Sequence, residues 1–545
     1  MKKQNFLQGV GILALATIIV KIISAFYKIP LNNIIGKEGY SYFLQTYSVY
    51  SFLLVISTTG LPVAVSRMIA ADEARGNWAQ LRQTNKASLL LFGTLGLEGS
   101  LIMVLFPRTL ANIMNVPDCS ATFLALGPAV LFVCINASLR GYFQGQENMT
   151  PTGVSQVIES LFKTLLGLLL ANLILKAGKS LVSSVAGAIF GVTVGSVFSF
   201  LYLFLIFRKN YRTLPKADSS MEVKSLRETS LELLAIAIPI TLGSAGLQLF
   251  DLIDSSMVMN RLQKAASLSY DLSLELRGLY GTAQTLFGLP AAMVIPFTAT
   301  LIPAVSACRA RGDEEGAYQT ACSEFRILFL VILPMAAGMI FLATPIISLL
   351  YPAYSPEDCR LAGGLLAILS IATTLNGMTV LLNALMQAHG YVKLPVINLL
   401  IGGFVKVLVN FVLVGIPGLN IYGAPWGTVC CYCVVTVLDI LSIRRLLTKS
   451  PKMLQLSWKP LVISLAMGVF AFATNRLLLS FFSERLACIA AILGAALFYL
   501  LGVISLKALT YEDCLLLPKG EYIAKLLRLK RSKSSSLKEI SHEED

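Results

Sequence analysis

Long apolar segments alternate with short polar ones along nearly the whole chain. Each apolar segment is long enough to cross a bilayer as a helix, which takes about 20 residues. We predict fourteen such spans, at 6–27, 41–66, 87–106, 119–140, 152–175, 183–207, 231–258, 279–305, 325–350, 361–387, 393–415, 421–443, 459–481 and 485–507. Because a helix satisfies its own backbone hydrogen bonds in lipid, the pattern predicts an all-α polytopic membrane protein.

The composition supports this class. Of the 545 residues, 56% are hydrophobic and only 14% are charged, whereas about 25% of a soluble domain is charged. The first apolar run follows Lys2 and Lys3 and continues to about Phe26 with no small-residue cleavage site. We therefore expect it to be a retained first span rather than a signal peptide.

Lys and Arg are distributed unequally between the two sides of the predicted spans. If the N-terminus is cytoplasmic, 29 of them lie in the inner segments, and far fewer lie in the outer ones. Cytoplasmic loops carry such an excess, so both termini are predicted to be cytoplasmic. The net charge of +14 then follows from topology and requires no nucleic-acid partner.

The two halves of the chain resemble each other. "AGAIFGVTVGSVFSFLYLFLIFRK" (186–209) aligns with "YGAPWGTVCCYCVVTVLDILSIRR" (422–445), and "ARGN" (74–77) aligns with "ARGD" (310–313) at the same offset. A six-span unit thus occurs twice, in one orientation. Parallel repeats of this kind are typical of transporters that rock one half against the other around a central site.

This repeat predicts a domain organisation. The expected parts are an N-lobe at 1–210 with spans 1 to 6, a cytoplasmic linker at 211–230 and a C-lobe at 231–447 with spans 7 to 12. Spans 13 and 14 follow at 448–508, and a basic tail ends the chain at 509–545. The tail is predicted to be solvated and to touch anionic headgroups, with a specific protein partner as the alternative.

Five stretches carry a resemblance to a known family. They are "IIGKEG" (34–39), "GLPVAVSRMIAADEARGN" (60–77), "RGYFQGQENMTPTGVSQVIES" (140–160), "LIDSSMVMNRLQ" (252–263) and "LIPAVSACRARGDEEGAY" (301–318). With the repeat, they make the chain similar to the multidrug/oligosaccharidyl-lipid/polysaccharide (MOP) exporter superfamily, in its SpoVB-like and MurJ-like flippase branch. The resemblance covers spans 1 to 12.

The resemblance implies a flippase in a bacterial cell membrane. It would move an undecaprenyl-linked saccharide, such as a peptidoglycan precursor, from the inner to the outer leaflet without covalent chemistry. The implied partners are the lipid-linked substrate and the membrane, together with cell-wall synthesis enzymes. A multidrug exporter driven by a cation gradient and a non-transporting scaffold of a polymer-synthesis complex are the alternatives.

Cations within or near spans are the candidates for binding a diphosphate head group, because intramembrane charge is costly and marks function. Lys21 and Lys28 fall where the flippase pattern has paired arginines, although Lys28 can also snorkel to the interface. Arg67 lies nearer the cytoplasmic end than the arginine of the flippase pattern. This departure favours a wider polyprenyl-sugar class than lipid II. Lys163 and its repeat counterpart Lys406 complete the set.

Acidic residues in the spans are candidates for charge pairing or ion coupling. Glu159 lies four residues before Lys163, so the two share a helix face and are expected to pair or to line a cavity. Glu98, Asp251 and Asp254 could carry a proton or help to bind sodium. The resemblance places Asp254 and Arg261 in an ion pair or an interface contact.

No bound cofactor or metal is expected. "AGKS" (177–180) lacks the first glycine of a phosphate-binding P-loop, because position 173 is Leu. The chain has two histidines, and its ten cysteines lack metal-site spacing. We expect a proton or sodium gradient to supply the energy.

The polar stretch "RGYFQGQENMTPTG" (140–153) lies between two predicted spans. It could be a ligand-binding loop or a turn. Its repeat counterpart "MQAHGYVKLP" (386–395) has a similar break with different polar residues. We therefore predict a structural hinge at the cytoplasmic end of spans 4 and 5.

Overall fold

The computed structural model describes residues 6–215 and 221–510, and no strand occurs in these two ranges. The longer helices are α1 (Phe6–Thr58), α2 (Gly60–Ala74), α3 (Trp78–Leu105), α5 (Ser120–Gly145), α6 (Thr150–Lys176), α7 (Leu181–Arg212), α8 (Leu226–Lys264), α9 (Tyr270–Ala310), α10 (Glu314–Phe341), α12 (Pro356–Ala388), α13 (Lys393–Leu413), α14 (Gly423–Leu446), α15 (Met453–Leu478) and α16 (Glu484–Ser505). Short helices are α4 (Pro107–Ile113) and α11 (Ala343–Leu350), with 3₁₀ turns η1 (Pro117–Cys119) and η2 (Asn420–Tyr422). The all-α prediction is confirmed.

Each of the fourteen predicted spans lies on one or two of these helices. The first two spans are nearly continuous, because residues 28–40 are helical rather than a loop. Gly36 interrupts α1 with a φ of 69°, a backbone conformation that glycine adopts at little cost. By length and hydropathy, eleven segments of the described chain could cross a membrane, and the first runs from Gly11 to Ala74. The protein is therefore a multi-pass membrane protein, and the count of fourteen stays a prediction.

At several helix starts, polar side chains accept hydrogen bonds from the backbone amides of the first turn. The Asn77 side chain accepts a hydrogen bond from the Gln80 amide at the start of α3. Ser225 and Glu228 form a capping box at the start of α8, and Ser355 and Asp358 form one at the start of α12. Such caps supply partners for amides that the helix itself leaves unpaired, so they define where these helices begin.

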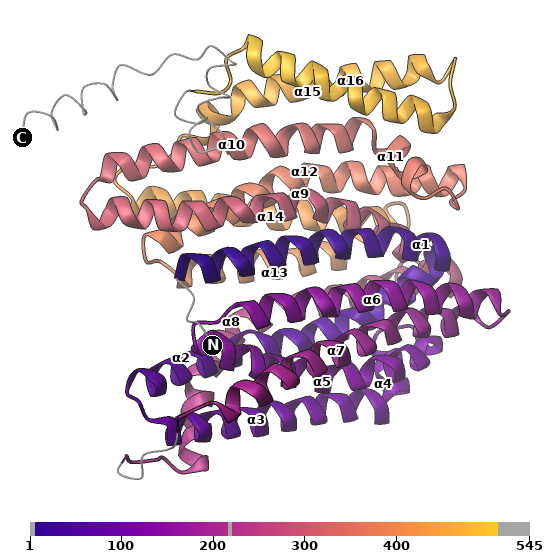
Figure 1. Ribbon diagram of the computed structural model, residues 1–545. Coiled ribbons are helices and arrows are strands. Elements are labelled where there is room, and N and C mark those ends of the chain that lie inside the picture. Colours follow the sequence, from indigo (N-terminus) through magenta and orange to yellow (C-terminus); the bar gives the residue numbers. More distant parts are fainter. Residues whose placement is uncertain (1–5, 216–220, 511–545) are drawn as a thin grey trace, which may run out of the picture. The chain divides into compact units, whose positions relative to one another are not determined.

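The chain divides into two compact units. The first contains residues 1–285 and 406–424, and the second contains residues 286–405 and 425–545. In the first unit, α6 packs against both α1 and α7, and α5 packs against α3 and α7 (Figure 1). A continuous apolar core fills this unit, with Tyr27, Phe43 and Phe123 among its fully buried side chains.

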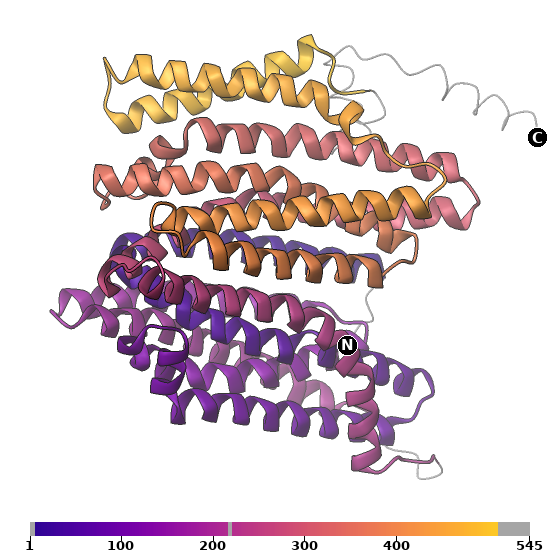
Figure 2. The ribbon, with the colours of Figure 1, turned by 180° about the vertical axis from the view of Figure 1, so that it is seen from behind.

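In the second unit, α10 packs against α12 and α15, and α15 packs against α16. The last two helices lie side by side in both views (Figures 1 and 2). The main core of this unit lies around Phe325 and Phe329 of α10 and Leu381 and Leu385 of α12.

The compact units differ from the predicted lobes. The first unit holds the whole of α8, the first part of α9 and residues 406–413 of α13, in addition to the predicted N-lobe. This division follows contacts rather than sequence symmetry, so the lobe boundaries at 210 and 231 stay predictions. The basic tail lies outside the described residues from position 511 onward.

Candidate functional site: a cation-rich cavity in the first unit

A cavity of about 370 Å³ lies within the first unit, between α1, α5 and α6. Three cations line it, Lys21, Arg140 and Lys163, together with one acid, Glu159. Thus the site brings together three of the predicted residues, one from α1 and two from α6. Cationic charge exceeds anionic charge in the lining, which favours an anionic ligand.

Arg140 links three helices around this cavity. Its Nε donates to Ser155 Oγ at 2.9 Å, and its Nη2 donates to Glu159 Oε2 at 2.8 Å and to Ser199 Oγ at 3.1 Å. The Arg140 and Glu159 side chains keep 12% and 21% of their surface exposed. The guanidinium is therefore held in place, with part of its surface left for the cavity.

Glu159 and Lys163, which were expected to pair with each other or to line a cavity, both line this cavity and do not pair. Glu159 pairs with Arg140 from the neighbouring helix α5. The Lys163 ammonium lies 5.6 Å from the centre of the Tyr27 ring and 5.9 Å from that of Tyr47. Two aromatic faces thus stabilise this cation without neutralising it, and it remains available to a negatively charged ligand.

Close packing of α6 on α7 sets the position of Glu159 and Lys163. A Cβ atom on Gly195 would lie 2.5 Å from the Glu159 carbonyl oxygen, and one on Gly191 would lie 2.5 Å from the Gly167 nitrogen. Only glycine permits these approaches. Small residues four apart are a common way to bring membrane helices together.

Lys21 is exposed and lines the cavity, whereas Lys28 is part-buried and does not line it. The Lys28 charge nevertheless interacts repulsively with those of Lys21 and Lys163. Another uncommitted polar group in the lining is Ser160, whose hydroxyl is buried with no hydrogen-bond partner among the described residues. The cavity therefore offers both charge and a free hydroxyl.

Lys406 lies in a separate cluster of the first unit. Its Nζ is 3.1 Å from Asp251 Oδ1 and 3.1 Å from Asp254 Oδ2, both on α8. The Asn410 amide also donates to Asp254. The partners of Lys406 thus come from another helix, and its ammonium occupies the position between the two carboxylates that were candidates for ion coupling.

Asp254 and Arg261, which were expected to form an ion pair or an interface contact, do not pair with each other. These residues are seven apart on α8, and Asp254 is buried against Lys406. The Arg261 guanidinium instead lies over the Phe411 ring, with its carbon 4.1 Å from the ring centre. Arg261 therefore takes part in an interface contact with an aromatic residue.

Arg67 lines a separate cavity, of about 630 Å³, where α2, α3 and α8 meet. Its lining also includes Asp72, Glu222, Lys224 and Glu232. The Glu232 carboxylate accepts a hydrogen bond from Lys224 at 2.6 Å and raises the pKa of that ammonium. Cations therefore do not outnumber acids here, unlike in the cavity lined by Lys21, Arg140 and Lys163, called the Lys163 cavity below.

Glu98 is exposed on α3 and lines none of these cavities. The structure therefore separates the ten predicted residues. Lys21, Lys163 and Glu159 share one cavity, and Lys406 shares a cluster with Asp251 and Asp254. Lys28, Arg67, Glu98 and Arg261 lie outside both groups.

Two functional candidates escaped the sequence-based prediction. Arg140 was counted as a loop charge at the end of span 4, although it begins one of the five motifs. Arg277 lies two residues before predicted span 8, yet it is buried on α9 and donates to Ser255 Oγ at 3.1 Å. In the sequence, each of these arginines stands at or near the end of a predicted span. Such a residue is buried only if the helix continues beyond the predicted end, as α5 and α9 do.

Comparison with known proteins identifies the chain's family. Residues 6–308, more than half of the chain, match the model of the family described as polysaccharide biosynthesis protein. The chain belongs to that family. The match includes the residues of the cation-rich cavity and, together with two relatives, confirms the predicted resemblance to SpoVB-like and MurJ-like proteins.

Two relatives come from Bacillus subtilis (strain 168). Stage V sporulation protein B is 27% identical over 457 residues, with 83% of this chain and 86% of that protein covered. Lipid II flippase MurJ is 26% identical over 482 residues, with 85% and 87% covered. These two relatives support the assignment of the chain to a bacterial membrane.

Solved structures show the same fold. The inward closed conformation of lipid II flippase MurJ superposes with a TM-score of 0.71 at 15% identity, covering 92% of this chain and 99% of that one. The inward-facing conformation of a multidrug resistance MATE family transporter of the MOP superfamily gives 0.63 at 16% identity, covering 79% and 97%. The chain thus shares its fold with these two solved structures.

Proposed function

We propose that the protein is a flippase for an undecaprenyl-linked saccharide, which it moves from the inner to the outer leaflet by alternating access. A peptidoglycan precursor or another surface polysaccharide intermediate would be the cargo. The flippase carries out no covalent chemistry. Proton or sodium coupling and cytoplasmic termini belong to the same proposal.

The observation that carries this proposal is the excess of cations around the cavity of the first unit. A diphosphate must leave water to cross the bilayer, and this is favourable only where fixed cations replace its hydration. Lys21 supplies one such charge, and Lys163, whose ammonium lies over the rings of two tyrosines, supplies another. Arg140 adds a guanidinium, which suits phosphate oxygens geometrically.

The same cavity argues against a multidrug exporter for organic cations. Such a cargo would be repelled by Lys21 and Lys163, and the single carboxylate in the lining is already paired with Arg140. Charge complementarity therefore favours an anionic cargo over a cationic one.

A depletion experiment tests the proposal. In a strain that depends on this protein, depletion should raise the level of one lipid-linked saccharide precursor, identified by mass spectrometry of extracted lipids. Lys21→Ala and Lys163→Met should each fail to complement at normal expression. Lys176→Ala is the matched control, because Lys176 is exposed at the far end of α6 and does not line the cavity.

Two results would contradict the proposal. Full complementation by well-expressed Lys21→Ala and Lys163→Met variants would exclude a role for these charges in phosphate binding. Unchanged precursor levels on depletion, combined with reduced accumulation of a fluorescent organic cation in cells that overproduce the protein, would instead favour a multidrug exporter.

A further inference from the structure

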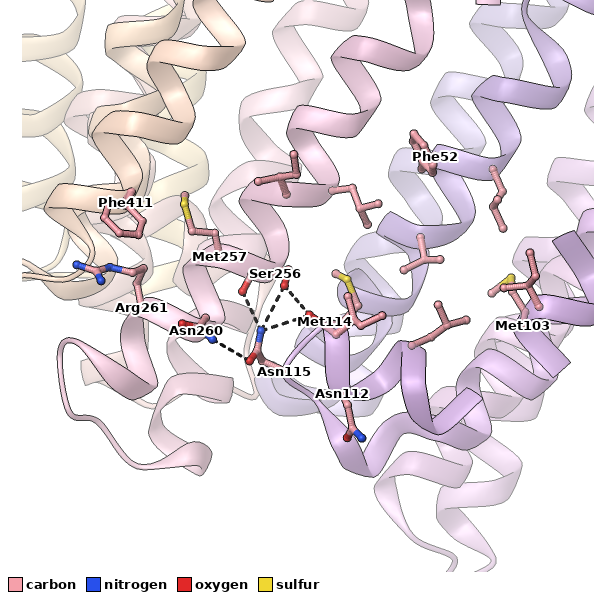
Figure 3. Close-up of a pocket in the computed structure, with 17 residues that line it drawn as sticks. Phe52, Met103, Asn112, Met114, Asn115, Ser256, Met257, Asn260, Arg261 and Phe411 are labelled. Carbon is pink, nitrogen blue, oxygen red and sulfur yellow. Dashed lines mark hydrogen bonds between the residues drawn. The ribbon is translucent and has the colours of Figure 1, made fainter. Parts of the chain in front are cut away.

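A second cavity of the first unit, larger and mostly apolar, has no role in the proposed transport. It measures about 740 Å³ and lies between α1, α3, α4 and α8 (Figure 3). Side chains such as Phe52, Met103 and Leu252 line its body. Its volume is within the range of sites that bind small molecules, about 300–1,000 Å³.

This groove opens onto an apolar surface. Ile102, Ile113 and Ile253 line it, yet they are 47%, 59% and 40% exposed. In a bilayer, exposed apolar side chains of spanning helices face lipid chains. A hydrocarbon chain can therefore enter the groove directly from the membrane, whereas water gains few polar contacts there.

The rim of the groove carries one cation and no acid among the residues that line it. Arg261 stacks on Phe411, and its Nε is buried without a hydrogen-bond partner in the described chain. A buried donor left unpaired costs about 1–3 kcal/mol. An anionic oxygen atom would satisfy this donor and match the charge of the guanidinium.

Two amide side chains, Asn260 and Asn115, also line the groove near Arg261. Asn260 donates to Asn115 Oδ1 at 3.2 Å, and the Asn115 amide donates to the Ser256 carbonyl oxygen at 3.2 Å (Figure 3). These bonds tie the turn after α4 to α8, so the polar rim is ordered. The groove is thus amphipathic, with an apolar body and a cationic, amide-lined rim.

The groove is distinct from the Lys163 cavity, although both lie against α1. Val49 and Leu53 line the groove, whereas Tyr50 and Leu54 line the cation-rich cavity, and no residue lines both. A lipid in the groove would therefore pack against α1, the helix that also carries Tyr47 and Tyr50 of the cavity. It would not occupy the space in which the cargo binds.

We propose that this groove binds an anionic phospholipid of the bilayer, with one acyl chain in the apolar body and the phosphate at Arg261. An apolar opening, an unpaired Arg261 donor and a lining without acidic residues favour such a ligand. Binding in this groove is independent of what the protein transports.

Binding can be measured on the purified, delipidated full-length chain. Phosphatidylglycerol should raise the melting temperature, and phosphatidylcholine with the same acyl chains should not. Arg261→Gln should weaken the phosphatidylglycerol affinity at least about tenfold, as expected for loss of a hydrogen bond to a charged group. Lys264→Gln is the matched control, because Lys264 is exposed one turn further along α8 and does not line the groove.

The acyl chain is located by photo-crosslinking with a phosphatidylglycerol that carries a diazirine in the chain. Labelled peptides should map to 102–115 and 249–261. Ile253→Trp at the mouth of the groove should abolish this labelling, whereas Leu249→Trp, one turn away and outside the lining, should retain it.

Equal effects of the two phospholipids, or unchanged affinity in a folded Arg261→Gln variant, would overturn the proposal. Labelling confined to other segments would do so as well. Preferential labelling of 102–115 and 249–261 by a photoreactive polyprenyl phosphate would also refute it, by assigning the groove to the chain of a transported lipid instead.

Discussion

At the scale of single residues, Arg140 links structure and charge in the candidate site. It binds Ser155, Glu159 and Ser199 at once, so it positions three helices, and it also adds a cation to the cavity. Structural and functional contributions of this side chain can be separated by changing its acidic partner as well.

Arg140→Gln should reduce both stability and transport. Removing one partner of a buried ion pair leaves the other charge uncompensated, at a cost of about 3–5 kcal/mol when burial is complete. The partial exposure of Glu159 reduces this cost. Melting in detergent and complementation measure the two effects separately.

In the double variant Arg140→Gln/Glu159→Gln, most of the stability should return, because no unpaired charge remains. Complementation should still fail, because the cavity has lost a cation. A double variant that complements like the unaltered protein would show that Arg140 acts only through the fold.

At the scale of helices, glycines determine how closely α6 and α7 approach. The contact at Gly195 involves the backbone of Glu159, so it bears directly on the cavity. By contrast, Gly93 of α3 has open space where a side chain would lie. The two positions form a natural comparison.

Gly195→Ala should destabilise the protein by about 1–3 kcal/mol, as overpacking does. Gly93→Ala should be neutral or stabilising by up to about 1 kcal/mol, since alanine favours a helix more than glycine. Thermal melting of the two purified variants compares these effects. Equal melting temperatures would show that α7 can move away from α6 without loss.

At the scale of the whole molecule, the number of crossings decides where the ends of the chain lie. Fourteen crossings, an even number, place both termini on one side of the membrane. If only the eleven segments selected by length and hydropathy crossed, the termini would lie on opposite sides.

Reporter fusions distinguish these topologies. A fluorescent protein fused after Asp545 should fluoresce in the cytoplasm, and alkaline phosphatase inserted after Tyr354, between α11 and α12, should be active outside. Cytoplasmic location of the Tyr354 insertion, or an external C-terminus, would contradict the predicted topology.

The amino-acid sequence by itself determined the class of protein, its family and several of the cavity's charges. Hydropathy and the positions of Lys21 and Lys163 within spans are local properties, and they can be read without knowing which helices are neighbours. The five motifs likewise indicated the relationship that the family match and the two relatives confirm.

Only the tertiary structure decided which charges meet. Glu159 pairs with Arg140, and Lys406 pairs with Asp251 and Asp254, because α5 packs near α6 and α8 near α13 in the fold. Such pairs form only between helices that are neighbours in the fold. The spacing of residues along one helix does not indicate which other helices lie next to it. The same holds for the apolar groove at Arg261, which exists only where residues of α1, α3, α4, α8 and α13 leave space between them.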